Sequence, residues 1–290
     1  MVAQRAGLVF LSRRVLLAMP LAVLGCRAAR AADDVARDAI ASVPLRDGLI
    51  PPLMLGIARV ALQPGASTWA ATTGGVRMLV VESGVLAIAT AASVERPLSA
   101  GELVLVAPPA NPVNEILAPA GSTMRFTGLG VSSVRNPGSR PVVWLDVAVF
   151  REAPRPLRRA FTTDDGVSFQ LMASAEAETA PVGPIAVELD RWRVPARSEA
   201  PDEASRGLSL LYIETGSLTI RPRSGDVQTA HAAAPAPYSQ PGALQRVAPD
   251  TAQSVTAGAV IFLPAASRAE IVNGRGRTAS LLALALREIA

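Results

Sequence analysis

The stretch GVRMLVVESGVLAI at residues 75–88 lines up without a gap on GLSLLYIETGSLTI at residues 207–220. The similarity continues downstream, where NPGSR at residues 136–140 matches NGRGR at residues 273–277. The two copies lie about 130 residues apart, which is too long for one unit of a solenoid but long enough for a domain. The sequence therefore predicts two similar domains in one chain.

The segments around this repeat have the composition of strands. From residue 49 onward, short runs rich in leucine and β-branched residues alternate with Gly, Pro, Asn and Ser. This pattern is typical of an antiparallel sandwich or barrel. We expect an all-β fold with one barrel over residues 45–152 and a second over residues 157–290. A single helix is predicted, over residues 33–42.

Two segments interrupt the apolar pattern. Residues 151–159, which are rich in arginine and proline, are the predicted boundary between the domains. Residues 222–256 form a predicted insert in the second domain, and an Ala/Pro-rich run within it holds His231. Such a run has no hydrophobic period, so we expect an exposed loop and a solvated histidine.

Composition excludes several classes of protein. The chain has 290 residues, of which 50 % are hydrophobic, so it is neither disordered nor fibrous. All 28 basic residues are arginines, and five of them lie within residues 1–31, which leaves 23 against 24 acids in the rest of the chain. The high isoelectric point therefore does not indicate nucleic-acid binding. The lone Cys26 and the lone His231 exclude a disulfide framework and a Cys/His zinc site.

The first 31 residues have the parts of a signal peptide. A basic stretch that ends in Arg13 and Arg14 precedes an apolar run of 11 residues, which is about 16 Å as a helix and too short to span a membrane. The segment resembles a twin-arginine export signal, and a general secretion signal is the alternative. Cleavage after Ala31 would release a soluble protein, whereas cleavage before Cys26 would leave a lipid-anchored one. Both place the mature protein in the periplasm or outside the cell, without a transmembrane helix.

The repeat resembles the cupin barrel, so the chain is identified as a two-barrel member of the cupin superfamily (a jelly roll, or double-stranded β-helix). The family's first motif, G(X)5HXH(X)3,4E(X)6G, falls in each copy on residues that keep a turn but replace the metal ligands: Gly65, Ala71, Thr73, Arg77 and Gly84, then Ala196, Asp202, Ala204, Ser209 and Gly216. The second motif, G(X)5PXG(X)2H(X)3N, falls in the second copy on Gly258, Pro264, Ala266, Ala269 and Asn273. In the first copy this motif is looser.

The resemblance implies a fold whose usual metal centre is missing. Most cupin enzymes hold a metal on three imidazoles and a carboxylate, and none of the residues at those positions here is a histidine. We therefore expect no metal, no cofactor and no catalytic residue of the ordinary cupin kind. An emptied site lined by small side chains can instead leave a cavity for a small ligand.

The ligand-binding candidates lie at or beside the positions where the resemblance places the emptied metal sites, and strand alternation directs Thr73 and Arg77 toward the inside of the first barrel. The candidates are Arg77, Thr73 and Trp69 in the first barrel, and Asp202 and Ser209 in the second. The guanidinium of Arg77 could clamp a carboxylate or phosphate. The alternative for Arg77 is an internal ion pair with an acid such as Glu82 or Glu115. Trp144 and Trp192 are expected to be core residues.

These observations favour a metal-free binding protein for a small molecule or glycan fragment, without catalysis. One alternative is a cupin-type enzyme that works with arginine and carboxylate side chains. The other is a structural protein that associates with itself through sheet edges.

Overall fold

The computed structural model describes residues 35–46, 49–90, 94–99, 102–106, 115–151, 166–200, 207–231, 242–274 and 276–289. For residues 69–74, 90, 94–99, 102–106 and 127–132 it describes the backbone alone. All of these residues belong to one compact unit, Ala32–Ala290. The signal segment, the boundary residues 152–159 and the Ala/Pro-rich run 232–241 lie outside the described residues, so what is predicted for them stays a prediction.

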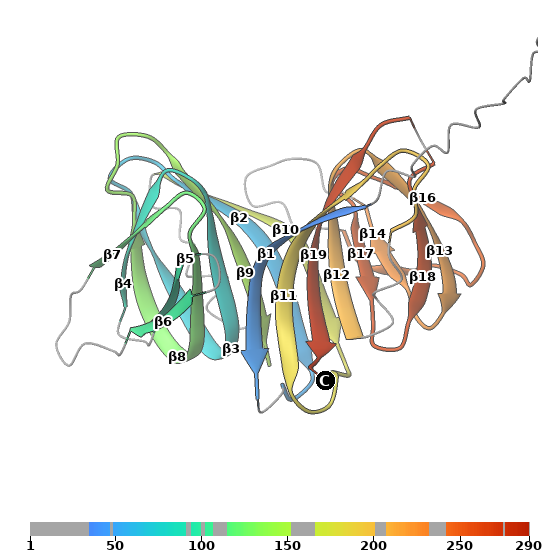
Figure 1. Cartoon of the computed structure of the whole chain (residues 1–290), viewed down its shortest axis with the longest axis horizontal. Helices are drawn as coiled ribbons and strands as arrows, with labels where there is room; N and C mark the ends of the chain where they lie inside the picture. The colour runs from blue at the N-terminus through green and yellow to red at the C-terminus, as the bar shows by residue number, and fades with distance from the viewer. Residues whose placement is uncertain are drawn as a thin grey trace, which may run out of the picture. The chain divides into compact units, whose positions relative to one another are not determined.

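The described residues form strands and turns and contain no helix, which confirms the all-β prediction (Figure 1). The strands of the first repeat and its surroundings are β1 (Ala36–Leu45), β2 (Leu53–Leu62), β3 (Ser67–Ser83), β4 (Val85–Thr90), β5 (Val94–Ser99), β6 (Glu102–Val106), β7 (Glu115–Pro119), β8 (Thr123–Arg135) and β9 (Val142–Phe150). Those of the second are β10 (Val167–Ala177), β11 (Ile185–Val194), β12 (Gly207–Thr215), β13 (Ser217–Ser224), β14 (Gln228–Ala230), β15 (Gln245–Arg246), β16 (Gln253–Thr256), β17 (Val260–Leu263), β18 (Arg268–Val272) and β19 (Ala279–Glu288).

The strands build two barrels. Barrel 1 is the sheet ordered β10-β2-β9-β3-β8-β4-β7, to which β5 and β6 add through β8. Barrel 2 consists of the sheet β1-β11-β19-β12-β17-β14-β15 and the smaller sheet β16-β13-β18. The two sheets of barrel 2 share one hydrophobic core, which contains Trp192, Ile213, Ile220 and Ile271. The predicted pair of barrels is thus present.

Each barrel takes one strand from the other repeat. β1 pairs antiparallel with β11 of barrel 2, and β10 pairs antiparallel with β2 of barrel 1 (Figure 1). β1 and β10 occupy equivalent places in the two repeats, which are offset by 132 positions as Gly75 is from Gly207. The predicted ranges 45–152 and 157–290 therefore do not coincide with the barrels, because each barrel includes a strand from outside its own range.

The helix predicted over residues 33–42 is wrong. Ala36–Leu45 is the strand β1, and its backbone pairs with β11 from Ala36↔Arg193 to Leu45↔Ile185. The alanines of this segment favour a helix in isolation. The free edge of β11 offers backbone hydrogen bonds along the whole segment, and this tertiary pairing overrides the weak local preference.

The repeated glycines are required by close packing of neighbouring strands. A Cβ at Gly75 would lie 2.0 Å from the carbonyl oxygen of Val149, and one at Gly207 would lie 1.9 Å from that of Leu286. Gly84 and Gly216 have φ values of 79° and 83°, a conformation that favours glycine in the turns that follow β3 and β12. The sequence repeat is therefore also a repeat of backbone geometry.

The repeated asparagines make the same hydrogen bonds in both barrels. The buried Asn136 amide donates to the carbonyl oxygens of Leu62 and Arg140 at 2.9 and 2.8 Å. The Asn273 amide donates to those of Val194 and Arg277 at 2.8 and 2.7 Å. Each asparagine thus fastens the loop before the last strand of its repeat to the second strand.

One detail of the motif alignment is wrong. The left-handed backbone of Gly65, with φ of 76°, has its counterpart at Arg197, with φ of 64°, and not at Ala196. Both residues donate their backbone N–H to the carbonyl oxygen of the repeated asparagine, Asn136 or Asn273. Because the counterpart is an arginine, glycine spacing alone could not locate this turn.

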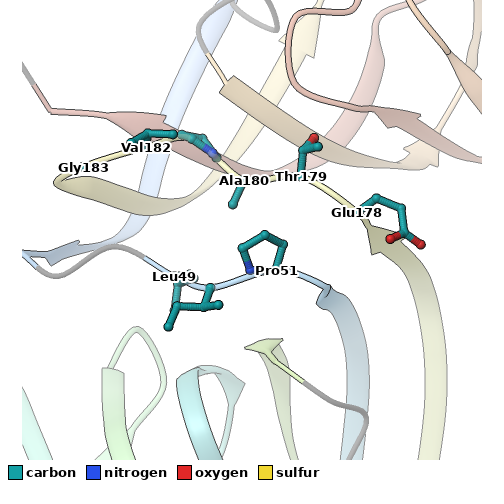
Figure 2. Close-up of a pocket in the computed structure, with 9 residues that line it drawn as sticks. Leu49, Pro51, Glu178, Thr179, Ala180, Val182 and Gly183 are labelled. Carbon is teal, nitrogen blue, oxygen red and sulfur yellow. The ribbon is translucent and has the colours of Figure 1, made fainter.

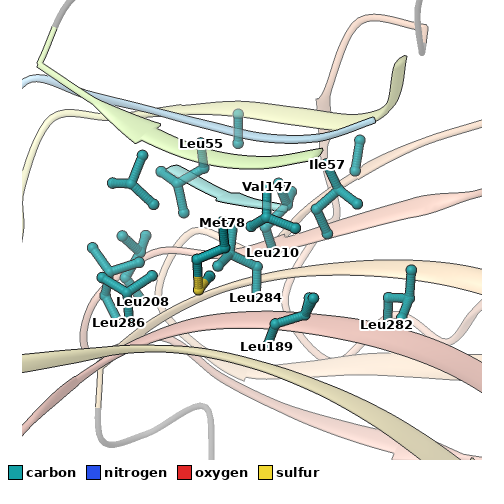
Figure 3. Close-up of a cluster of buried hydrophobic side chains, with 14 of the residues drawn as sticks. Leu55, Ile57, Met78, Val147, Leu189, Leu208, Leu210, Leu282, Leu284 and Leu286 are labelled. Carbon is teal, nitrogen blue, oxygen red and sulfur yellow. The ribbon is translucent and has the colours of Figure 1, made fainter. Parts of the chain in front are cut away.

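The outer faces of the two large sheets pack on each other in a third core. Leu55, Ile57, Met78 and Val147 of barrel 1 meet a leucine-rich surface of barrel 2, and all of them are fully buried (Figure 3). The leucines are Leu189, Leu208, Leu210, Leu282, Leu284 and Leu286. The alternation of each strand therefore divides its side chains between this shared core and the inside of its own barrel.

Four charged side chains lie at the same contact between the barrels, and they repeat the internal symmetry. Arg59 donates to Glu82 at 2.8 Å within barrel 1, and Arg191 donates to Glu214 at 2.7 Å within barrel 2. The pairs also cross, because Arg59 lies 3.5 Å from Glu214 and Arg191 lies 3.3 Å from Glu82. Burial lowers the pKa of Arg59, but the hydrogen bond and charge of Glu82 outweigh it, so the pKa is raised. The cluster thus links the barrels with balanced charge.

Candidate functional site

Arg77 points into barrel 1, as the strand alternation predicts. Its neighbours Leu79 and Val81 belong to the core inside barrel 1, whereas Val76 and Met78 belong to the core between the barrels. The interior also contains large apolar side chains that are almost completely buried: Trp144, Phe126, Met124, Leu86 and Ile88. Along the described walls, the inside of barrel 1 is a packed core.

Arg77 is held by an acid that the sequence did not single out. Its side chain is 4 % exposed, and its Nε donates to Oδ1 of Asp146 at 2.8 Å while Nη2 contacts Oδ2. This geometry is the predicted internal ion pair, but its partner is neither Glu82 nor Glu115. Glu115 instead pairs with Arg135, whose hydrogen bond lowers the pKa of that carboxyl. The guanidinium fork of Arg77 is therefore occupied by a carboxylate of the chain itself, which leaves it unsuited to clamp an external anion.

The other predicted site residues are only partly placed. The backbone of Trp69 pairs with Ser133 of β8, and that of Thr73 pairs with Leu129, while their side chains lie outside the description. Asp202 lies outside the described residues. Ser209 is 6 % exposed and occupies in barrel 2 the place that Arg77 occupies in barrel 1. Ligand binding by these residues stays a prediction.

Three further expectations concern the aromatic residues and the histidine. Trp144 and Trp192 are 2 % and 4 % exposed and lie in the cores of barrels 1 and 2, as predicted. Their indole Nε1 atoms are buried and have no hydrogen-bond partner among the residues that the structure describes. His231 is exposed at the end of β14, in agreement with a solvated side chain.

A group of charged side chains lies on the inner face of barrel 2, where the sequence indicated none. We call Arg287, Glu188, Arg37 and Asp190 the charged ladder. Arg37 donates to Asp190 at 2.7 Å through Nε and to Glu188 at 3.1 Å through Nη2. The Nε atom of Arg287 lies 3.1 Å from Oε2 of Glu188. Arginines and acids thus alternate along the group, with a net charge of zero.

The strand register explains why these four residues meet. Arg37 lies opposite Trp192 on β11, so it faces the inside of barrel 2, and the long side chain reaches Asp190 two residues along. Glu188 lies opposite Ala285 on β19, and Arg287 follows two residues later on the same face. Ser209 is also paired with Ala285, which places it in the same row as Glu188. Three strands, β1, β11 and β19, therefore deliver the ladder to the inner face, and β12 adds Ser209.

The charged ladder is buried at Asp190 and partly exposed at its other three members. The side chain of Asp190 is 3 % exposed, whereas those of Arg287, Glu188 and Arg37 are 15 %, 25 % and 31 % exposed. In barrel 1 the equivalent positions are Phe150, Gly56, Phe169 and Ala58, in the same order, with Phe169 supplied by β10. The ladder is thus a property of barrel 2 alone and is accessible to water.

Among the described residues, no group of three or more His, Cys, Asp or Glu side chains is arranged to hold a metal ion. Within the same residues, no helix has the length and apolar character needed to cross a membrane.

Comparison with known proteins gives a likeness at the level of the fold. No model of a known protein family matches the chain, and no curated protein matches it. The chain is similar in structure to the cupin 2 conserved barrel domain protein from Leptotrichia buccalis, with 12 % identity, coverage of 86 % of this chain and 90 % of the other, and a TM-score of 0.36. The fold named there is the one that the motif resemblance predicted.

Two further structures match over a similar length. They are oxalate decarboxylase from Lactobacillus farciminis, with 9 % identity, coverage of 87 % and 82 % and a TM-score of 0.38, and vicilin from Corylus avellana, with 10 % identity, coverage of 87 % and 85 % and a TM-score of 0.38. At these identities the likeness concerns the fold and says nothing of activity.

Proposed function

We propose that this protein is an exported binding protein for a small polar molecule, which it holds against the charged ladder of barrel 2. The observation that carries the proposal is the contrast between the repeats. Barrel 1 has Phe150, Gly56, Phe169 and Ala58 at the equivalent positions, so the fold does not need charge there. Burying charged groups costs free energy even when they are paired. Charge retained at this cost inside one barrel supports a role in binding.

The chemistry of the ladder favours an uncharged ligand with several hydroxyl groups, such as a glycan fragment. The two arginines and two acids balance, so a ligand with a net charge would meet no opposite excess. Guanidinium groups present several N–H donors in a fixed plane, and carboxylates accept hydrogen bonds. Together they can bind the neighbouring hydroxyl groups of a sugar, which both donate and accept. Ser209 adds a hydroxyl in the same row, and the indole N–H of Trp192, which has no partner among the described residues, adds a donor in the same barrel.

Export is proposed from the sequence of residues 1–31. The basic stretch with Arg13 and Arg14, the short apolar run and the small residues before Ala32 support a cleaved signal. A periplasmic or extracellular location also suits a protein that collects sugars. Retention through an acylated Cys26 remains the alternative product of the same segment.

The proposal is tested by thermal unfolding of residues 32–290 with neutral sugars, such as N-acetylglucosamine, maltose and cellobiose, and with the charged glucuronate and glucosamine. A ligand at about 100 times its Kd stabilises the folded state by about 2.7 kcal/mol. We expect a neutral sugar to raise the melting temperature and the charged ones to have a smaller effect. Glu188→Gln keeps the shape of the side chain and should weaken binding about tenfold, because a hydrogen bond to a charged acceptor is lost.

The matched control is Asp38→Asn, since Asp38 lies on β1 next to Arg37 but pairs with Arg193 at an exposed position. This variant should bind as the unchanged protein does. Equal weakening by both substitutions, or binding of glucuronate in preference to every neutral sugar, would contradict the proposal. If the protein converts a bound sugar to a product, its function is that of an enzyme and not of a binding protein.

A further inference from the structure

A pocket outside both barrels lies where the two repeats meet. It has a volume of about 390 Å³, within the lower range of small-molecule sites. One wall comes from the loop between β1 and β2, and the other from the loop between β10 and β11 (Figure 2). Its lining residues are Leu49, Ile50, Pro51, Glu178, Thr179, Ala180, Pro181, Val182 and Gly183.

The two walls are equivalent positions of the repeat. Leu49 corresponds to Pro181 and Ile50 to Val182, each pair separated by 132 positions. Ile50 is 64 % exposed and Val182 is 88 % exposed, which makes them two of the few large apolar side chains that the described surface leaves in water. An exposed apolar pair beside a pocket indicates a surface that becomes covered when a ligand binds.

The described lining of the pocket carries negative charge and no positive charge. Among the described residues that line it, Glu178 is the single ionisable one, and it is exposed. No ion pair or hydrogen bond joins its carboxylate to any described residue, whereas many acids of this arginine-rich chain are paired. The equivalent residue of the first repeat, Arg46, does not line the pocket. The site therefore combines apolar walls with one unpaired negative charge at its edge, where Figure 2 shows Glu178 beyond Thr179.

We propose that this pocket binds a small apolar molecule with one positive charge, such as an aliphatic or aromatic primary ammonium ion. The apolar part covers Ile50, Pro51 and Val182, and the ammonium group pairs with Glu178. This site is separate from the charged ladder and does not depend on the function proposed for it.

The probe is 2-phenylethylammonium, and its charge-reversed counterpart is 3-phenylpropionate. Binding to residues 32–290 is followed by NMR chemical-shift changes during titration. We expect the amine to shift the signals of residues 49–51 and 178–183, and the carboxylate to bind more weakly. Because surface ion pairs contribute little, Glu178→Gln should weaken amine binding only about twofold to fivefold. Val182→Arg, at the most exposed lining residue, should abolish it by repulsion without loss of folding.

The matched control is Glu176→Gln, since Glu176 is exposed on β10 outside the pocket and should leave binding unchanged. Failure of the amine to bind, equal binding of the amine and the carboxylate, or equal effects of Glu176→Gln and Glu178→Gln would overturn the proposal. Loss of sugar binding in the Glu188→Gln variant, with amine binding intact, would show that the two sites are independent.

Discussion

The insides of barrel 1 and barrel 2 carry charge in different ways. Barrel 1 seals one pair, Arg77 and Asp146, among apolar side chains at 3 % and 6 % exposure. Barrel 2 has Ser209 and Ala283 at those two places and carries its charges as the ladder on β1, β11 and β19, partly open to water. The same backbone thus supports a sealed structural pair and an accessible polar group.

This difference separates charge that holds a barrel together from charge that can meet a ligand. A sealed pair is buried out of reach of an outside molecule, and breaking it leaves a buried ion without its partner. A partly exposed row can exchange water for ligand hydroxyls at a smaller cost. Substitutions that remove one partner in each barrel should therefore differ in size.

The largest effect is expected for Asp146→Ala. It leaves the Arg77 guanidinium buried without its carboxylate, which should lower the free energy of unfolding by about 3–5 kcal/mol. Asp190→Ala should cost less, because Arg37 keeps Glu188 and 31 % of its side chain remains in water. Urea unfolding at constant m-value measures both.

A double variant sharpens this prediction. Arg77→Ser with Asp146→Ala gives barrel 1 the residues of barrel 2, so no charge is left unpaired. It should be more stable than Asp146→Ala alone. If the double variant is the less stable of the two, Arg77 contributes by packing and not by its charge.

The next largest effect on stability is expected at the two glycines that the repeats share. In Gly75→Ala and Gly207→Ala, the added methyl group would lie about 2 Å from a carbonyl oxygen of the neighbouring strand, that of Val149 or Leu286. We expect both to lose about 1–3 kcal/mol, by similar amounts, because the strands must separate. Gly56→Ala is the control, since its Cβ would meet nothing within 4 Å. A large loss in only one barrel would contradict the equivalence of the repeats.

Much of this architecture could be predicted from the sequence. The 75–88 and 207–220 repeat marked equivalent strands, and its glycines and asparagines proved to be positions of close backbone approach and of shared hydrogen bonds. Strand alternation also placed Arg77 on the inner face. Short-range patterns of this kind depend on neighbouring residues and are therefore visible in a single sequence.

The charged partners on different strands could not be predicted from the sequence. Asp146 is 69 residues from Arg77, and Arg37 is 153 residues from Asp190, so neither pair leaves a local pattern. The sequence also did not show that β1 and β10 each pair with the barrel of the other repeat, because local propensity made residues 33–42 resemble a helix. The alternation of Ala186, Glu188, Asp190 and Trp192 in β11 did place two acids on one face, but their arginine came from the segment taken for that helix.

The smallest effect concerns the surface that the barrels share, where Tyr212 of barrel 2 corresponds to Val80 of barrel 1. Burial raises the pKa of Tyr212 above its ordinary value of about 10, Arg59 lowers it and Glu214 raises it further. The folded protein favours the neutral phenol, so this contribution to stability is complete below about pH 10 and is lost as the pH rises through the raised pKa.

Absorbance at 295 nm follows this ionisation, and Tyr238→Phe removes the other of the two tyrosines. In that background, Arg59→Gln should raise the pKa of Tyr212 further, because a nearby positive charge is lost, while Glu214→Gln should lower it. Arg193→Gln, at an exposed pair on β11, serves as the control and should leave it unchanged. Opposite shifts would mean that charges from both barrels act on one side chain across their contact. Shifts of the same sign would mean that loosening of the contact, and not the individual charges, sets the pKa.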